Sequence, residues 1–116
     1  MPDTLRIGFL GAGKMATALA RGWIAAGLAT PESITASDPS PSAREAFTRE
    51  TKAATQTENL RVLAASDVVI LAVKPQSMPE VLKEIKRKIT SKHLVVSVAA
   101  GIPIEQIADV IGLDRR

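Results

Sequence analysis

The chain has 116 residues, of which 46% are hydrophobic and 23% charged, as in a single soluble globular domain. It contains no Cys, no Tyr and one His, which excludes disulfides, cysteine-ligated zinc, multi-histidine metal sites and tyrosine acids. The net charge of +3 is too small to indicate nucleic-acid binding.

In the first half of the chain, short apolar runs alternate with helical patterns. Leu5–Leu10 predicts a buried strand, and apolar residues at helical spacing follow until Gly27. Ser33–Ser37 predicts a second strand, after which Ser40 is suited to cap a helix and Pro41 to begin it. The later predictions are a helix over 42–50, a weak strand near 53–55 and a short helix over 58–65.

The second half has stronger patterns. Asp67–Val73 is a continuous β-branched run, typical of a central parallel strand. Ser77 and Glu80 have the spacing of a capping box at the start of a helix. The apolar stripe expected on that helix consists of Met78, Val81, Leu82, Ile85 and Ile89. Leu94–Ala99 predicts another buried strand.

A last helix is expected from Pro103, with one apolar face formed by Ile104, Ile107, Ala108 and Ile111. Strands separated by helical crossovers imply a parallel sheet. The fold class is therefore α/β, a doubly wound parallel sheet of the Rossmann type, in a single domain over residues 1–116.

The densest basic segment is interleaved with Glu80 and Glu84, so we interpret it as the solvated face of a helix; it consists of Lys83, Lys86, Arg87, Lys88 and Lys92. The N-terminus does not resemble a signal peptide, and the longest uncharged apolar stretch, Leu94–Ile104, is too short to span a membrane. We expect a soluble, cytoplasmic protein with no nucleic-acid or membrane partner.

The segment between the first strand and the first helix carries the G-x-G-x-x-A form of the dinucleotide-binding motif, Gly11 to Ala16. Gly11 would allow the tight turn, Gly13 a close approach of the backbone to a pyrophosphate, and Ala16 close packing of helix on strand. The helix N-terminus would attract the phosphates. Its position between a strand and a helix favours dinucleotide binding over an ordinary turn.

Asp38 ends the second strand, where an acidic residue holds the adenosine ribose of NAD in such folds. An equally good interpretation is that Asp38 only starts the Asp-Pro turn. Alternatively, Ser37, Ser40 and Arg44 are candidates to hold the 2′-phosphate of NADP. The nucleotide preference stays open.

Lys74 follows the fourth strand, where the cofactor's ribose and phosphates would lie; taken alone, a surface lysine is an equally good interpretation. Small residues over 97–101 end the fifth strand and leave room for a flat ring such as nicotinamide, or simply form a cramped turn from strand to helix. His93 would lie at the opposite edge of the sheet and is expected to be structural. Trp23 and Met78 fit apolar helix faces and are predicted to be core residues.

Four segments together resemble the N-terminal domain of the pyrroline-5-carboxylate reductase family: Ile7–Gly22 (IGFLGAGKMATALARG), Ile34–Ser40 (ITASDPS), Ser66–Gln76 (SDVVILAVKPQ) and Val95–Ile102 (VVSVAAGI). The resemblance covers nearly the whole chain. It implies an NAD(P)H-dependent reductase that converts 1-pyrroline-5-carboxylate to L-proline, the last step of proline biosynthesis.

The resemblance also implies cofactor-binding residues. The pyrophosphate would be held by Leu10, Gly11, Ala12, Gly13, Lys14 and Met15, and the adenosine ribose region by Ser37, Asp38 and Asn59. The nicotinamide ribose would be lined by Ala72, Val73, Lys74 and Pro75, and the nicotinamide by Val98, Ala99 and Ala100. It implies no metal, and no catalytic side chain within this chain.

The sequence departs from the family pattern in two ways. Pro39 follows Asp38 where many members have a basic residue for a 2′-phosphate, so NADP and NAD both remain candidate cofactors. Family members are more than twice as long, and their second half is a helical domain that forms the dimer and holds the substrate. We therefore expect a cofactor-binding domain with little reductase activity alone, and an intact protein that is a homo-oligomer with a small-molecule substrate.

Two other functions remain open on the sequence. One is another reductase with a similar N-terminal domain, such as a 3-hydroxyacid dehydrogenase or an F420-dependent NADP reductase. The other is a non-catalytic nucleotide-binding module.

Overall fold

A computed structural model describes residues 5–90 and 93–98 of the chain. Its strands are β1 (Ile7–Leu10), β2 (Ile34–Ser37), β3 (Ala54–Gln56), β4 (Val68–Leu71) and β5 (Leu94–Ser97). Its helices are α1 (Lys14–Ala25), α2 (Pro41–Thr51), α3 (Asn59–Ala64) and α4 (Met78–Lys86), with 3-10 turns at Pro31–Ser33 and Pro75–Ser77. The predicted order of elements is confirmed as far as β5. The predicted helix from Pro103 and residues Lys92, Ala99 and Ala100 lie outside the described residues.

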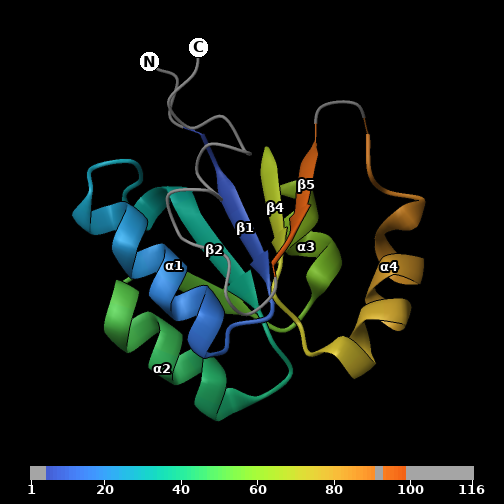
Figure 1. The fold of residues 1–116 in the computed structure, drawn as a ribbon, viewed down its shortest axis with the longest axis horizontal. Helices are drawn as coiled ribbons and strands as arrows, with labels where there is room; N and C mark the ends of the chain where they lie inside the picture. Colours follow the sequence, from blue (N-terminus) through green and yellow to red (C-terminus); the bar gives the residue numbers. More distant parts are fainter. Residues whose placement is uncertain (1–4, 91–92, 99–116) are drawn as a thin grey trace.

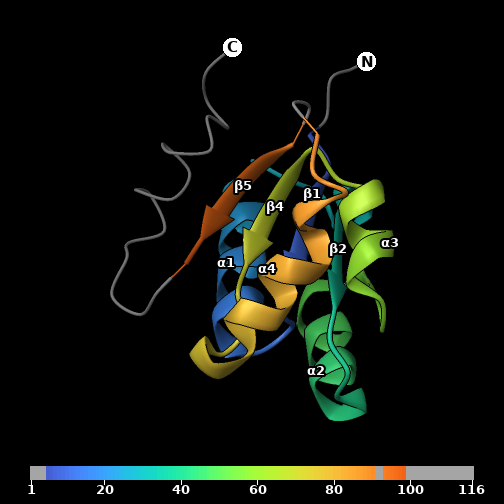
Figure 2. The same cartoon turned by 90° about the vertical axis from the view of Figure 1, so that its right-hand side faces the viewer.

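The five strands form one parallel sheet in the order β3-β2-β1-β4-β5. The order reverses at β1, which pairs with β2 on one side and β4 on the other, so the predicted doubly wound fold is confirmed. Helices α1 and α2 cover one face of the sheet, and α3 and α4 cover the other (Figures 1 and 2). The carboxyl ends of β1 and its two neighbours therefore meet at one edge, where ligands of such sheets bind.

The core has two parts, one under each helical layer. Phe9 stacks on Trp23 with ring centroids 5.8 Å apart and meets Phe47 edge-on at 5.9 Å. The prediction that Trp23 belongs to the core is thus confirmed. On the other face, α3 and the turn after it approach β1 so closely that a Cβ on Gly8 would lie 2.6 Å from a methyl carbon of Val62 in α3 and 2.1 Å from the Ser66 hydroxyl oxygen in the turn. That glycine is required by the packing of α3 on β1.

A local signal sets the start of α2. Ser40 accepts a hydrogen bond from the backbone N–H of Ala43, and Pro41 is the first helical residue, so the predicted start of α2 is confirmed. The predicted capping box at Ser77 is wrong. Ser77 is already helical and donates its N–H to the Lys74 carbonyl, because a 3-10 turn leads directly into α4. Its side chain makes no capping bond.

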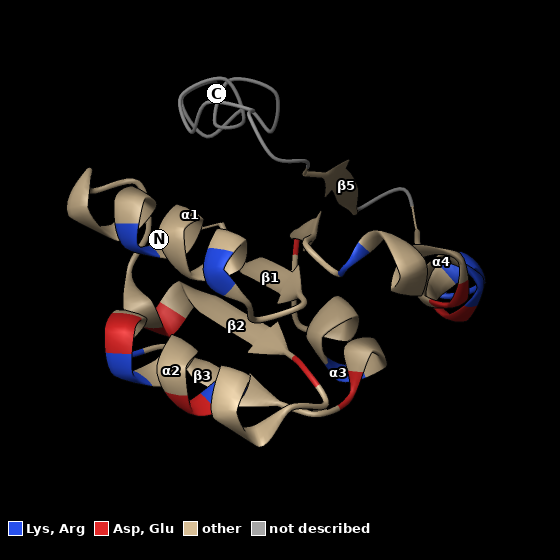
Figure 3. Ribbon diagram, turned by 60° about the horizontal axis from the view of Figure 1, so that its bottom comes forward, with Lys and Arg blue, Asp and Glu red and all other residues tan. Residues whose placement is uncertain are grey.

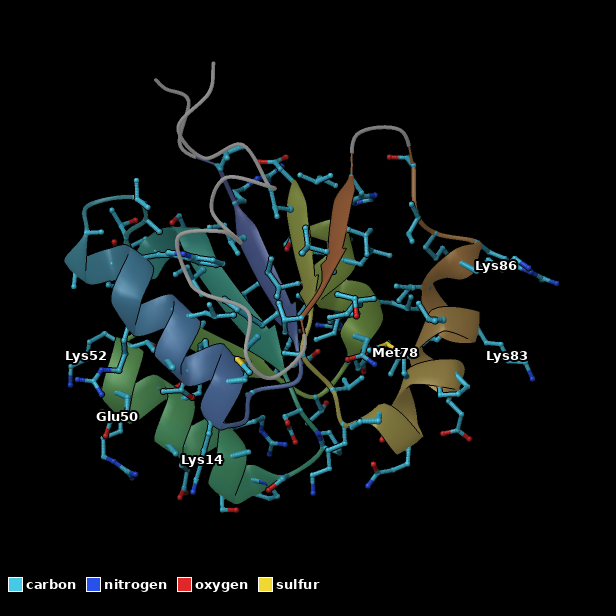
Figure 4. All side chains as sticks on the ribbon, in the orientation of Figure 1. Lys14, Glu50, Lys52, Met78, Lys83 and Lys86 are labelled. Carbon is cyan, nitrogen blue, oxygen red and sulfur yellow. The ribbon has the colours of Figure 1, made fainter. Side chains whose placement is uncertain are left out.

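The apolar stripe predicted on α4 is only partly buried. Val81 and Ile85 pack in the core and Met78 packs against it, whereas Leu82 is 44% and Ile89 36% exposed. The prediction for Ile89 was wrong because α4 already ends at Lys86, and the prediction for Leu82 was wrong because this residue lies on the exposed side of the helix. Lys83 and Lys86 project from α4 away from the sheet, as predicted for a solvated face (Figure 4). In the described part of the chain, no helix is long and apolar enough to cross a bilayer.

Candidate cofactor site at the carboxyl edge of the sheet

The turn after β1 is bound to both neighbouring strands. Gly11 donates its N–H to the Ser37 carbonyl at 2.8 Å, and Ala72 donates to the Leu10 carbonyl at 2.9 Å. Gly11 has φ +104°, and a Cβ there would lie 2.6 Å from the Ala72 carbonyl oxygen. Glycine is therefore required at this position for both its backbone conformation and its closeness to β4. Leu10 itself is fully buried, so only its backbone belongs to this edge.

Gly13 differs from Gly11. Its φ is −81°, and a Cβ added to it would meet no protein atom within 4 Å. The fold by itself therefore does not require glycine here, and the space beside Gly13 is left open at the start of α1. No side chain caps this helix, so its first N–H groups are available to an anion. The residues present thus fit the pyrophosphate of a dinucleotide.

Asp38 connects the end of β2 to the turn after β1. One carboxylate oxygen accepts the N–H of Ala12 and the other the N–H of Ser40, both at 2.9 Å. The bond to Ser40 is the one expected of an Asp that starts a turn. The Asp38 backbone carbonyl accepts a hydrogen bond from the Arg44 guanidinium at 2.7 Å.

Among the candidates for a 2′-phosphate, Ser37 is fully buried and its hydroxyl donates to Asn59. Arg44 lines a different groove, between α2 and β3. Ser40 uses its hydroxyl to cap α2. Lys14, at the start of α1, borders a groove between α1 and α2 together with Ala12 and lies beside α2 in Figure 4.

Two cavities lie along this edge. The first, of about 500 Å³, is the β1–β2 cavity; the predicted residues that line it are Gly11, Gly13, Ser37, Asp38, Asn59, Ala72, Val73 and Lys74. The second, of about 570 Å³, is the β4–β5 cavity; it is lined by Met15, Ala72, Val73, Pro75, Met78, Ser97 and Val98. Ala72 and Val73 border both, so the two cavities meet at the end of β4.

The cavities differ in chemistry. The described residues of the β4–β5 cavity carry no titratable side chain, and it is mostly apolar. The β1–β2 cavity is also lined by Glu80 and Glu84 of α4, which no sequence motif had indicated as site residues. Acidic residues occur on α4 beside its lysines (Figure 3). The four-residue spacing of the two glutamates puts them on the same face of a helix. Only the packing of α4 against the rest of the fold shows that this face borders the β1–β2 cavity.

His93 lies at the amino-terminal edge of β5, away from both cavities. Its Nε2 lies 3.0 Å from the Leu63 carbonyl oxygen, and its Nδ1 accepts the N–H of Thr90 at 3.0 Å. The predicted structural role of His93 agrees with these contacts. Nearby, the pKa of Asp67 is lowered, mainly because its carboxylate accepts the backbone N–H of Arg6.

The family model described as NADP oxidoreductase coenzyme F420-dependent matches residues 6–101. A pyrroline-5-carboxylate reductase from Methanosarcina acetivorans is 44% identical over 113 residues, which cover 94% of this chain and 40% of that protein. The chain therefore spans about two fifths of the length of this relative.

Two solved structures share the fold. A pyrroline-5-carboxylate reductase from Coxiella burnetii has a TM-score of 0.77 and 32% identity, covering 95% of this chain and 41% of that one. A pyrroline carboxylate reductase from Plasmodium falciparum with NADP bound has a TM-score of 0.71 and 26% identity, covering 98% of this chain and 40% of that one.

Proposed function

Since this chain belongs to the family of NADP oxidoreductases described as coenzyme F420-dependent, we propose that it is the cofactor-binding domain of a pyrroline-5-carboxylate reductase. The reaction is reduction of the C=N bond of 1-pyrroline-5-carboxylate by NADPH or NADH, giving L-proline. The observation that carries the proposal is the pair of joined cavities, because a dinucleotide needs one pocket for each nucleoside with an anion site between them.

Different residues of the chain bind different parts of the dinucleotide. The open space at Gly13 and the uncapped start of α1, with Lys14 and Met15 in its first turn, hold the pyrophosphate. Asp38 and Asn59 lie at the adenosine ribose in the β1–β2 cavity. The residues from Ala72 to Pro75 line the nicotinamide ribose, and Val98 borders the nicotinamide in the β4–β5 cavity. Ala99 and Ala100 keep the same predicted role.

The bound reduced nicotinamide supplies the hydride. The task of this domain is to hold the ring in place and to exclude water from it, for which the apolar β4–β5 cavity is suited. An iminium carbon accepts hydride readily, so the domain does not need an acid–base pair of its own. Substrate contacts and the interface of a homo-oligomer are assigned to a second domain, corresponding to the remaining length of the relatives. The cytoplasm is the expected compartment.

A second candidate is an F420-dependent NADP reductase, which the description of the matched family favours. The relatives at 38–44% identity carry the name pyrroline-5-carboxylate reductase, which favours the first candidate. Both candidates use the same cofactor site. Assay of a longer protein containing this domain with each substrate pair separates them.

The direct test of the cofactor site is calorimetric titration of the chain with NADPH and with NADH. We expect saturable binding that Gly13→Asp abolishes, because a carboxylate there would occupy and repel the pyrophosphate position. Ala25→Asp, which adds the same charge at the exposed other end of α1, is the control and should bind normally. Failure of the unaltered chain to bind either nucleotide at millimolar concentration would contradict the proposal.

A further inference from the structure

One part of the β1–β2 cavity is acidic. Glu80 and Glu84, one turn apart on α4, line it, while Gly11 and Gly13 border it at the start of α1. A phosphate is stabilised at a helix N-terminus and repelled by carboxylates. The part of the cavity beside α4 therefore suits an uncharged group that carries hydrogen-bond donors.

Glu84 is exposed, and two hydrogen bonds in series link its carboxylate through Asn59 to the end of β2. The Ser37 hydroxyl lies 2.5 Å from Asn59 Oδ1, and Asn59 Nδ2 lies 2.9 Å from Glu84 Oε1. An ionised carboxylate only accepts hydrogen bonds, so Asn59 must turn its NH₂ group to Glu84 and its carbonyl to Ser37. Ser37, fully buried at the end of β2, then donates. The direction of these hydrogen bonds is thereby fixed, and the Asn59 NH₂ group orients one oxygen of the exposed Glu84 carboxylate.

Glu84 keeps an acceptor free. Its Oε2 has no hydrogen-bond partner within residues 5–90 and 93–98, and no Lys or Arg of that part forms an ion pair with it. Lys83 and Lys86 of the same helix point away from the fold (Figure 4). The cavity, which Lys74 also lines, therefore presents a carboxylate oxygen with no ion-pair partner within 4 Å in the described part of the chain.

We propose that Glu84 selects adenine as the base of the bound dinucleotide by accepting a hydrogen bond from its exocyclic amino group. The inference rests on the proposed function, since it concerns the same cofactor site. Adenine carries an NH₂ donor at C6. Hypoxanthine carries a carbonyl oxygen at that position, which a carboxylate repels. Asn59 is the positioning residue that holds Glu84.

The test is calorimetric titration of the chain with NADPH, with NADH and with the hypoxanthine analogue of each. The unaltered chain should bind the adenine form at least about tenfold more tightly, the lower end of what a hydrogen bond to a charged group contributes. Glu84→Gln should bring this ratio close to one, because an amide can donate to the hypoxanthine carbonyl. Glu45→Gln, an exposed glutamate of α2 outside this cavity, is the control and should leave the ratio unchanged.

Glu84→Gln is suited to the test because glutamine has the size of glutamate and its side-chain carbonyl can still accept a hydrogen bond from the Asn59 NH₂ group. Glu84→Ala, which should also lose the discrimination, is the second variant. A ratio near one in the unaltered chain, or a ratio that Glu84→Gln leaves unchanged, would overturn the role of Glu84 but not the cofactor site. If none of the four dinucleotides binds, the proposed function fails together with this inference.

Discussion

The Asp38 carboxylate accepts a 2.9 Å hydrogen bond from the backbone N–H of Ala12, which lies 26 residues earlier in the chain. The end of β2 and the turn after β1 are thus joined by a side chain as well as by the Gly11–Ser37 backbone bond. Ala12 is buried, and Asp38 is the acceptor that its N–H has in the fold.

Asp38→Ala should therefore lower the free energy of unfolding by about 1–3 kcal/mol, since it leaves the N–H of the buried Ala12 without its acceptor. Asp38→Asn keeps one acceptor oxygen and should cost less. Urea denaturation followed by circular dichroism measures both. An unchanged midpoint for Asp38→Ala would show that this bond does not stabilise the turn.

Gly8→Ala should destabilise the fold by about 1–3 kcal/mol, because the new methyl group would overlap the Ser66 hydroxyl and a Val62 methyl group. The measurement is thermal or urea unfolding. In a Ser66→Ala background part of the loss should be recovered, since the shortest contact is then removed. If Gly8→Ala unfolds like the unaltered chain, α3 does not pack on β1 as described.

Gly13→Ala, in contrast to Gly8→Ala, should weaken dinucleotide binding and leave the stability of the fold nearly unchanged. Nothing in the described part of the chain lies within 4 Å of the new Cβ, so stability should change by no more than about 1 kcal/mol, the scale of an N-cap substitution. Dinucleotide affinity should fall at least about tenfold, because the methyl group enters the phosphate position. Calorimetry measures the affinity and urea unfolding measures the stability of the same preparation. Loss of stability with intact binding would refute the assignment of the pyrophosphate to the space beside Gly13.

Lys52→Gly should stabilise the fold by about 0.5–1 kcal/mol. Lys52 ends α2 with φ +67°, a left-handed conformation that costs non-glycine residues energy. It lies on the surface beside α2 (Figure 4). Lys52→Ala is the matched variant, and it should show no gain because alanine has the same backbone strain. Equal unfolding midpoints for the glycine and alanine variants would argue against strain at this position.

The pKa of Asp67 is lowered in the fold, chiefly by the backbone N–H of Arg6 and further by the Arg6 side chain. A lowered pKa in the folded state means that the carboxylate stabilises the fold above its unfolded pKa. This stabilisation is lost as the pH falls through the folded pKa. Unfolding measured between pH 6 and about pH 2.5 should therefore show a loss at low pH that Asp67→Asn reduces. A pH dependence identical in both proteins would exclude this contribution.

Much of this architecture could be predicted from local patterns. The β-branched run that became β4, the Ser40-Pro41 start of α2 and the Gly11 turn depend on residues that are neighbours in the chain. Dihedral preferences and periodic burial act over such short distances, so the order of strands and helices followed from the sequence. The capping box at Ser77 failed because the 3-10 turn before it supplied a backbone partner that the spacing does not reveal.

The sequence by itself thus determined the parallel α/β fold, the glycine turn and the family resemblance. Only the tertiary structure decided how the polar groups are used: Asp38 bonded to Ala12, Ser37 buried against Asn59, and Glu84 turned to the same cavity. The physical reason is that a hydrogen bond depends on the distance and direction between two groups. For residues 22 to 26 positions apart, those quantities are set by how strands and helices pack, which no local pattern encodes.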